Sequence, residues 1–191
     1  MLSYTTMEYM QALEKAWKDA AELIADKRVS VKFLADEYEI DAENKKVFSV
    51  SCNIPAKEHV SLIILHYLIK KIKLGSLPMP TGKWIDFREL KGAEGYYPAF
   101  KKRTIETILR KYGERPEELL NAATRFCAKK VQVGDVGIAI EAFKNAPILI
   151  TLSRADEEFG PDANILFDEN IREIFCTEDI VVLTEILVHV L

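Results

Sequence analysis

One segment constrains the fold of this chain more than any other: a predicted helix over 56–73 that is apolar around most of its circumference. Pro55 precedes it, and Gly75 with the 78–80 segment ends it. Its large apolar residues are Leu62, Ile63, Ile64, Leu65, Tyr67, Leu68, Ile69 and Ile72. A helix with this pattern must be covered on nearly every side, so we expect it to lie at the centre of the fold.

Helical and strand patterns follow one another irregularly along the rest of the chain. Helices are predicted over 7–25, 98–112, 116–128 and 177–191, and strands over 29–33, 38–40, 47–50, 136–143 and 147–152. A strand is the alternative over 177–191, because Val and Ile are dense there. No β-α-β alternation is sustained, so the sequence predicts a single α+β domain over 1–191. We expect a mixed or antiparallel sheet packed by about five helices. A division into two lobes near 74–80 is the alternative.

Composition limits the class of protein. The 191 residues carry 26 Lys and Arg against 30 Asp and Glu, a formal net charge of −4, and 49% are hydrophobic. A chain of this length buries about 70% of its unfolded surface, enough for one core. The mildly acidic balance argues against a general nucleic-acid binder. With no basic and apolar leader visible and no apolar run long enough for a bilayer, we expect a cytoplasmic protein without a membrane partner.

The cysteines exclude the common local metal sites. Cys52, Cys127 and Cys176 are far apart, and no Cys-x-x-Cys pair exists. Neither a zinc ribbon nor an iron–sulfur cluster is built from such spacing. We predict no metal site on them and expect reduced thiols in the interior of the protein.

The central helix also carries the most informative histidine. His59 and His66 are seven residues apart, which separates them by about 10 Å of helical rise, too far to share one metal ion. His66 and its neighbour Tyr67 lie in otherwise apolar surroundings. Two interpretations stay open for His66: a core histidine hydrogen-bonded to a carboxylate or to the backbone, or a group that contacts a ligand or a metal.

Aromatic and basic residues gather in the segment over 82–103. Its candidate ligand-binding residues are Lys83, Trp84, Arg88, Tyr97 and Arg103. Aromatic rings beside Arg and Lys suit a planar or anionic ligand, through stacking and charged hydrogen bonds. The alternative is that the same residues form a buried join between a strand and a helix.

An acidic cluster follows later in the chain. Asp156, Glu157 and Asp168 offer hard oxygen ligands for Mg²⁺ or Ca²⁺, although the spacing of a calcium-binding loop is absent. With His66 as a proton carrier, these carboxylates predict a metal-assisted enzyme as the alternative function. Ion pairing with arginines or capping of a turn is the structural interpretation of the same residues.

These segments also carry a family resemblance. The motifs are His66-Tyr67-Leu68, Gly82-Lys83-Trp84-Ile85, Phe87-Arg88-Glu89-Leu90, Tyr96-Tyr97-Pro98-Ala99-Phe100, Gly134-Asp135, Asp156-Glu157-Glu158-Phe159, Ala163-Asn164-Ile165-Leu166-Phe167-Asp168 and Thr177-Glu178-Asp179. In this order the chain resembles the domain-of-unknown-function family numbered 3786, found in anaerobic bacteria and archaea. Some members of the family look like fusions to an iron–sulfur module of the corrinoid methyl-transfer type. The resemblance implies anaerobic one-carbon or redox metabolism, and a corrinoid or other tetrapyrrole as a candidate ligand.

Three hypotheses for the function result. The leading one is an accessory protein that binds a planar or anionic cofactor in a hollow shared by the aromatic, basic and acidic candidates. The second is the metal-assisted enzyme. The third is a structural subunit that binds a partner protein or forms a homodimer, and it predicts an exposed apolar patch around Phe87 or on the C-terminal helix.

Overall fold

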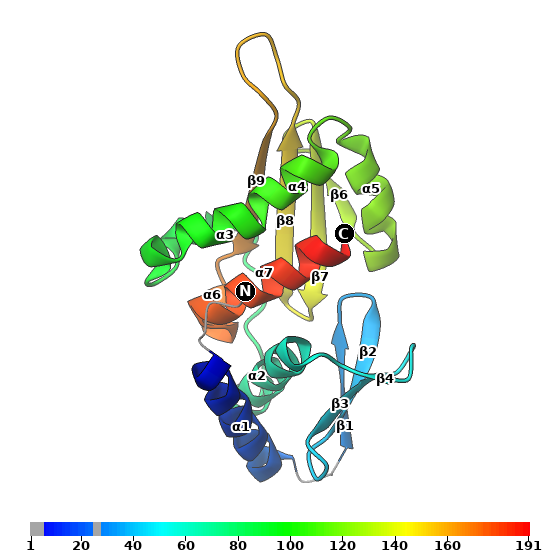
Figure 1. Cartoon of the computed structure of the whole chain (residues 1–191), viewed down its shortest axis with the longest axis vertical. Coiled ribbons are helices and arrows are strands. Elements are labelled where there is room, and N and C mark those ends of the chain that lie inside the picture. The colour runs from blue at the N-terminus through cyan, green and yellow to red at the C-terminus, as the bar shows by residue number, and fades with distance from the viewer. Residues whose placement is uncertain (1–5, 25–27) are drawn as a thin grey trace.

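The computed structural model describes residues 6–24 and 28–191, which form an α+β fold (Figure 1). The helices are α1 (Thr6–Leu23), α2 (Glu58–Leu74), α3 (Tyr97–Arg103), α4 (Ile105–Tyr112), α5 (Glu117–Ala123), α6 (Ile171–Ile174) and α7 (Thr177–Val190). The strands are β1 (Arg28–Phe33), β2 (Asp36–Asp41), β3 (Lys46–Ser49), β4 (Ile54–Pro55), β5 (Trp84–Asp86), β6 (Lys129–Val131), β7 (Val136–Phe143), β8 (Ala146–Ser153) and β9 (Asp162–Asp168). The predicted fold class is confirmed.

The strands form two sheets in which every paired neighbour is antiparallel. The smaller sheet has the order β1-β2-β3-β4, and the larger has the order β5-β9-β8-β7-β6. The Leu34 amide, just after β1, donates a 2.7 Å hydrogen bond to the Ala142 carbonyl of β7 and so links the two sheets. Helices α3, α4 and α7 cross the face of the larger sheet that is toward the viewer in Figure 1.

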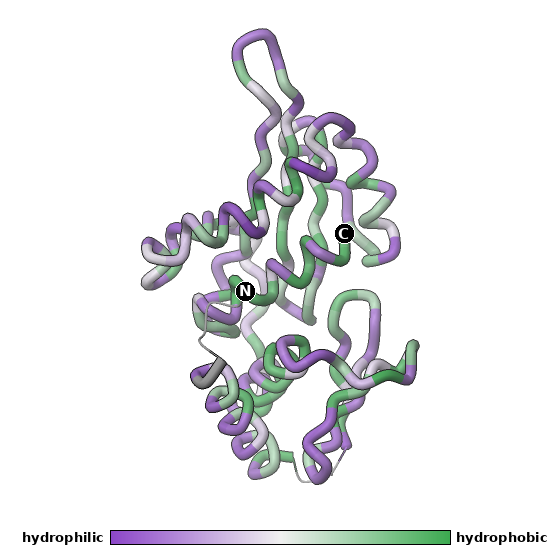
Figure 2. Tube along the Cα trace, in the orientation of Figure 1, coloured by the Kyte–Doolittle hydropathy of each residue, from purple (hydrophilic) through white to green (hydrophobic). Residues whose placement is uncertain are grey.

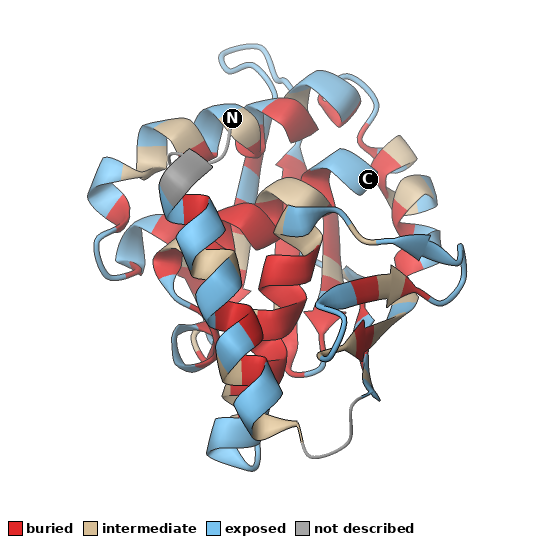
Figure 3. Cartoon of the chain, turned by 60° about the horizontal axis from the view of Figure 1, so that its bottom comes forward, coloured by how far each residue is buried: buried red, intermediate tan, exposed pale blue. Residues whose placement is uncertain are grey.

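Helix α2 lies at the centre of the molecule, as its apolar pattern predicts. It contacts α1, α6, α7 and β1, and Figure 3 shows it buried along most of its length behind α1. From Ser61 to Ile69 every side chain is buried except that of His66, which is half-buried. The helix ends where Gly75 adopts a φ of 71°, a value that favours glycine.

Stacked aromatic rings join α2 to both sheets. The Phe143 ring of β7 lies 4.5 Å from Phe33 of β1 and 4.4 Å from Tyr67 of α2. Strands β7 and β8, which are mostly apolar in Figure 2, are buried along almost their whole length. Since one cluster of buried side chains includes residues of both sheets, a continuous core holds them together.

Some predicted elements differ in extent. The helix expected over 98–112 breaks at Thr104, whose buried hydroxyl donates to the Phe100 carbonyl one turn earlier and competes with the backbone ladder. The helix expected over 116–128 gives way to a 3₁₀ turn, Thr124–Phe126, and then to β6. Strand β5 was not predicted, because its three residues are too few to give a local strand signal. Strand β9 was missed, although Ala163, Ile165 and Phe167 alternate with less buried residues as in a half-buried strand. The C-terminal segment is a helix, not the alternative strand.

Two further expectations are wrong. The three cysteines are exposed rather than interior, since each lies in a turn or at a helix end. The apolar patch expected for a structural subunit is not exposed either: Phe87 is fully buried against Phe100, with ring centroids 4.0 Å apart, and α7 is buried along most of its length.

Within the described ranges, no helix combines the length and the apolar character that crossing a membrane requires.

Candidate functional site

A cavity of about 520 Å³ opens between α1, α2 and the 172–179 segment. Its volume lies in the range of small-molecule sites. Helix α2 contributes His66, Ile69, Lys70 and Lys73, which recur at three- and four-residue steps and therefore share one face of the helix. A polar stripe on this largely buried helix thus faces the cavity.

The His66–Asp179 pair lies on the wall of this cavity. His66 Nδ1 is 2.8 Å from Asp179 Oδ1, and the two side chains are 28% and 8% exposed. An ionised carboxylate accepts and does not donate, so Nδ1 carries the proton of this hydrogen bond. No hydrogen bond to Nε2 occurs in the described part of the chain. His66 is therefore held by a carboxylate, as one interpretation required, and yet it lies at a cavity, as the other required.

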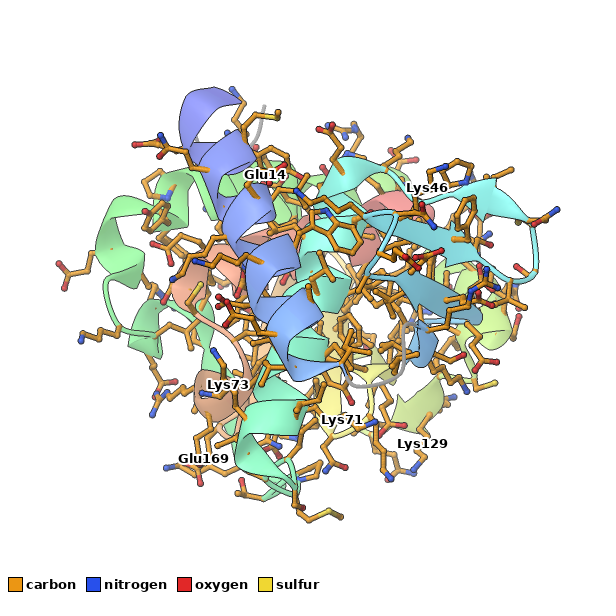
Figure 4. The ribbon with its side chains drawn as sticks, turned by 90° about the horizontal axis from the view of Figure 1, so that it is seen from below. Glu14, Lys46, Lys71, Lys73, Lys129 and Glu169 are labelled. Carbon is orange, nitrogen blue, oxygen red and sulfur yellow. The ribbon has the colours of Figure 1, made fainter. Side chains whose placement is uncertain are left out.

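Basic side chains surround the cavity. Lys15 of α1, Lys70 and Lys73 of α2 and Arg172 of α6 line it, against the carboxylates of Asp19 and Asp179. Figure 4 shows Lys73 on the side of α2 toward α6 and Lys71 on the opposite side. Four cations against two carboxylates leave the lining positive when His66 is neutral.

Some of these cations have protein partners and others do not. Lys73 Nζ lies 3.6 Å from Asp19 Oδ2, and the Arg172 guanidinium donates to the Glu89 carbonyl at 3.0 Å. Lys15 and Lys70 have no ion pair with any residue that the structure describes. Their ammonium groups are therefore available to an anion.

Cys176 lies directly before α7 and lines the same cavity. The residue as a whole is exposed, but desolvation of its thiol and the charge of Asp179 raise the pKa of Cys176 to about 12. Since the thiolate is the nucleophilic form of cysteine, this side chain is a thiol at neutral pH and a poor nucleophile.

The aromatic and basic candidates lie outside the cavity and have partners of their own. Lys83 Nζ pairs with Glu169 at 2.8 Å, and Trp84 lies half-buried on the edge strand β5. Arg88 binds Asp86 through Nε at 2.8 Å, and its guanidinium lies 5.0 Å from the centre of the Tyr97 ring. These side chains connect β5 to the segment that follows it. This agrees with the structural interpretation of residues 82–103, a join between a strand and a helix.

Arg103 and Tyr67, the remaining aromatic and basic candidates, also contact other parts of the protein rather than the cavity. Arg103 of α3 pairs with Glu185 of α7 at 3.0 Å. Tyr67 is buried on Phe143, and its hydroxyl donates to the Lys144 carbonyl at 3.2 Å. Burial, with the nearby charge of Glu141, raises the pKa of Tyr67 to about 12.

Asp156 and Glu157 lie in the loop between β8 and β9, which projects from the sheet at the top of Figure 1. Asp156 Oδ1 accepts the amides of Phe159 at 2.7 Å and Glu158 at 2.9 Å. These hydrogen bonds hold the pKa of Asp156 below its usual range. Asp156 caps its turn, and Glu157 beside it is exposed.

Asp168 lies at the other end of β9, about 20 Å from the loop by the rise of a strand. It is 1% exposed, and its carboxylate accepts the backbone amides of Thr81, Asn170 and Gly82 at 3.0, 3.1 and 2.6 Å. Burial by itself raises the pKa of this carboxyl, but those hydrogen bonds outweigh it and hold the pKa below its usual range. No group of three or more potential metal ligands occurs among the residues described.

The structure therefore brings only one candidate, His66, to the cavity. The residues that the sequence did not reveal are Lys15, Lys70, Lys73, Arg172, Cys176 and Asp179. The spacing of His66, Lys70 and Lys73 on an apolar helix is a signal that identifies the cavity-facing stripe. No local pattern identifies Asp179 as the partner of His66.

The comparisons with known proteins give one result. A family model described as Domain of unknown function (DUF3786) matches residues 13–190, which include the charged and histidine residues of the cavity. No curated protein and no solved structure matches the chain.

Proposed function

The chain belongs to the DUF3786 family, and we propose that it is a binding protein for a small organic anion held between α1, α2 and residues 172–179. The observation that carries the proposal is the positive lining of the cavity around the His66–Asp179 pair. Lys15 and Lys70, which pair with no residue in the described ranges, supply positive charge, and His66 Nε2 supplies a directed polar contact.

An apolar component accompanies these charges. Ile69, Ile174 and Phe175 line the cavity, and Ala12 and Ala16 of α1 leave space beside them. Sites for small molecules combine such apolar walls with a few polar groups that fix the orientation of the ligand. This combination favours an organic anion over a bare inorganic ion.

The state of Cys176 argues against catalysis by a thiolate. Cys176 lines the cavity, and its pKa of about 12 keeps the thiol protonated at neutral pH. The metal-assisted alternative has less support, because Asp168 is occupied by backbone amides and Asp156 lies in the β8–β9 loop, both away from His66.

A metallated tetrapyrrole is the second candidate ligand. Histidines that bind metals commonly donate their other ring N–H to a carboxylate, as His66 does to Asp179. The resemblance adds anaerobic one-carbon or redox metabolism as the proposed setting, and we propose the cytoplasm, expected from the sequence, as the location. Titration with hemin and with hydroxocobalamin, followed by absorbance, tests this candidate: a spectral change that His66→Ala abolishes supports it, and unchanged spectra exclude both cofactors.

The anion-binding proposal is tested by NMR on ¹⁵N-labelled protein. Benzoate and phenyl phosphate are the anionic probes, and benzyl alcohol is the neutral control. We expect both anions to shift amide signals of residues 66–73 and 172–179, and the alcohol to leave them unchanged. Lys70→Gln should weaken the response, whereas Lys71→Gln, on the other side of α2, should not. Absence of shifts for both anions up to about 10 mM would overturn the proposal.

A further inference from the structure

We infer that the ligand is a phosphate monoester with an apolar body, a conclusion that rests on the proposed anion-binding function. The first argument is charge balance. Lys15, Lys70, Lys73 and Arg172 face Asp19 and Asp179 in the cavity, which leaves two positive charges in excess. A phosphate monoester carries about −1.5 to −2 at neutral pH and matches this excess, whereas a carboxylate carries one charge.

The second argument is the type of cation. The planar fork of arginine binds a carboxylate or a phosphate through two parallel hydrogen bonds, whereas lysine binds phosphate as a compact point charge. The one arginine of the cavity, Arg172, already donates to the Glu89 carbonyl. Lys15 and Lys70, which form no ion pair with a described residue, have compact ammonium groups. Several ammonium groups suit the three oxygens of a phosphate, which presents acceptors in different directions.

The third argument is the length of the polar stripe. His66 and Lys73 are seven residues apart on α2, so their Cα atoms differ by about 10 Å along the helix axis. A bare phosphate reaches one end only. Ile69 lies between them on the cavity wall, with Ile174 and Phe175 on the 172–179 segment. A ligand that fills this length has a phosphate near the lysines and an apolar body that extends toward His66.

Isothermal titration with matched probes tests the inference. Phenyl phosphate is the dianion with a ring, methyl phenyl phosphate has the same ring with one charge, and inorganic phosphate lacks the ring. We expect phenyl phosphate to bind about tenfold more tightly than either of the others at equal ionic strength. Lys70→Gln should remove most of this preference, and Lys71→Gln should leave it intact. Unfolding midpoints of both variants are measured to show that they are folded.

The outcomes separate this inference from the proposed function. Equal affinity for phenyl phosphate and methyl phenyl phosphate would leave anion binding in place and overturn the phosphate monoester. Equal affinity for inorganic and phenyl phosphate would overturn the apolar body. If the anions, benzoate included, all fail to bind, the proposed function itself is wrong.

Discussion

His66 Nδ1 and Asp179 Oδ1 lie 2.8 Å apart and join the central helix to α7 across 113 residues of chain. Asp179 is nearly buried, and His66 is partly exposed and lines the cavity. The pair therefore has two roles. Its hydrogen bond holds α7 against α2, and it also orients the imidazole in the candidate binding site.

Asp179→Asn should lower the free energy of unfolding by about 1–2 kcal/mol, because a charged hydrogen bond to a largely buried carboxylate is lost. Urea unfolding at pH 7 measures it. Glu178→Gln is the matched control: it removes a neighbouring carboxylate of the first turn of α7, whose partner is the Tyr96 hydroxyl. We expect the control to cost less than half as much, and equal costs would contradict the role given to His66.

Asp168→Asn should destabilise the protein by about 2–3 kcal/mol at pH 7, because an amide cannot accept all the N–H groups that converge on this buried carboxylate. Asp162→Asn, on the same strand but exposed, is the control, with an expected change below about 0.5 kcal/mol. Similar losses of unfolding free energy for the two variants would contradict the stabilising role of the Asp168 carboxylate.

The contribution of Asp168 should also depend on pH. Folding lowers its pKa, so the stabilisation is fully present above the pKa of an unfolded Asp, about 3.9. It is lost as the pH falls through the lower pKa of the folded state. The difference in unfolding free energy between wild type and Asp168→Asn should therefore stay constant from pH 7 to about 5 and shrink below about 4. A difference that grows in acid would contradict this assignment.

Tyr67→Phe separates packing from ligand binding. The Tyr67 hydroxyl donates to the Lys144 carbonyl, and the ring stays stacked on Phe143 after the change. We expect a loss of about 1 kcal/mol in unfolding free energy and no change in the affinity for phenyl phosphate. An altered affinity with unchanged stability would indicate that Tyr67 takes part in ligand binding.

Cys176 should be alkylated more slowly than the other exposed cysteines. With a pKa of about 12, its thiolate fraction at pH 8 is on the order of 10⁻⁴, against roughly a quarter for a thiol of pKa about 8.5. Iodoacetamide labelling followed by peptide mass spectrometry compares it with Cys52 and Cys127. Asp179→Asn should accelerate labelling by removing a negative charge. Fast labelling of Cys176 in the wild type would count against its protonated state.

Elements with a strong local pattern were predictable. The buried stripe of α2 and the strands β7 and β8 follow from the spacing of apolar residues, which is a property of consecutive positions. The C-terminal segment was less certain, because its dense Val and Ile left a strand as the alternative to the helix that forms. Strand β5 was not predictable in this way. Its three residues pair with β9, 80 or so positions later, and only that pairing makes them a strand.

The candidate site was less predictable than the fold. Arg88 illustrates the reason, since the sequence shows a cation near aromatic rings, and the structure shows it bound to Asp86 two residues away. Asp168 is a second case, a carboxylate that its own neighbours in space satisfy completely. Residue type indicates what a side chain can bind, but not whether the protein already binds it.

The sequence by itself determined that a helix over about 56–73 is central to an α+β fold, because the burial of a segment follows from the order of its own residues. Only the tertiary structure decided that the polar stripe of this helix meets Lys15, Arg172 and Asp179 around a cavity. Those side chains come from segments far apart along the chain, and their approach depends on long-range packing that no local spacing encodes.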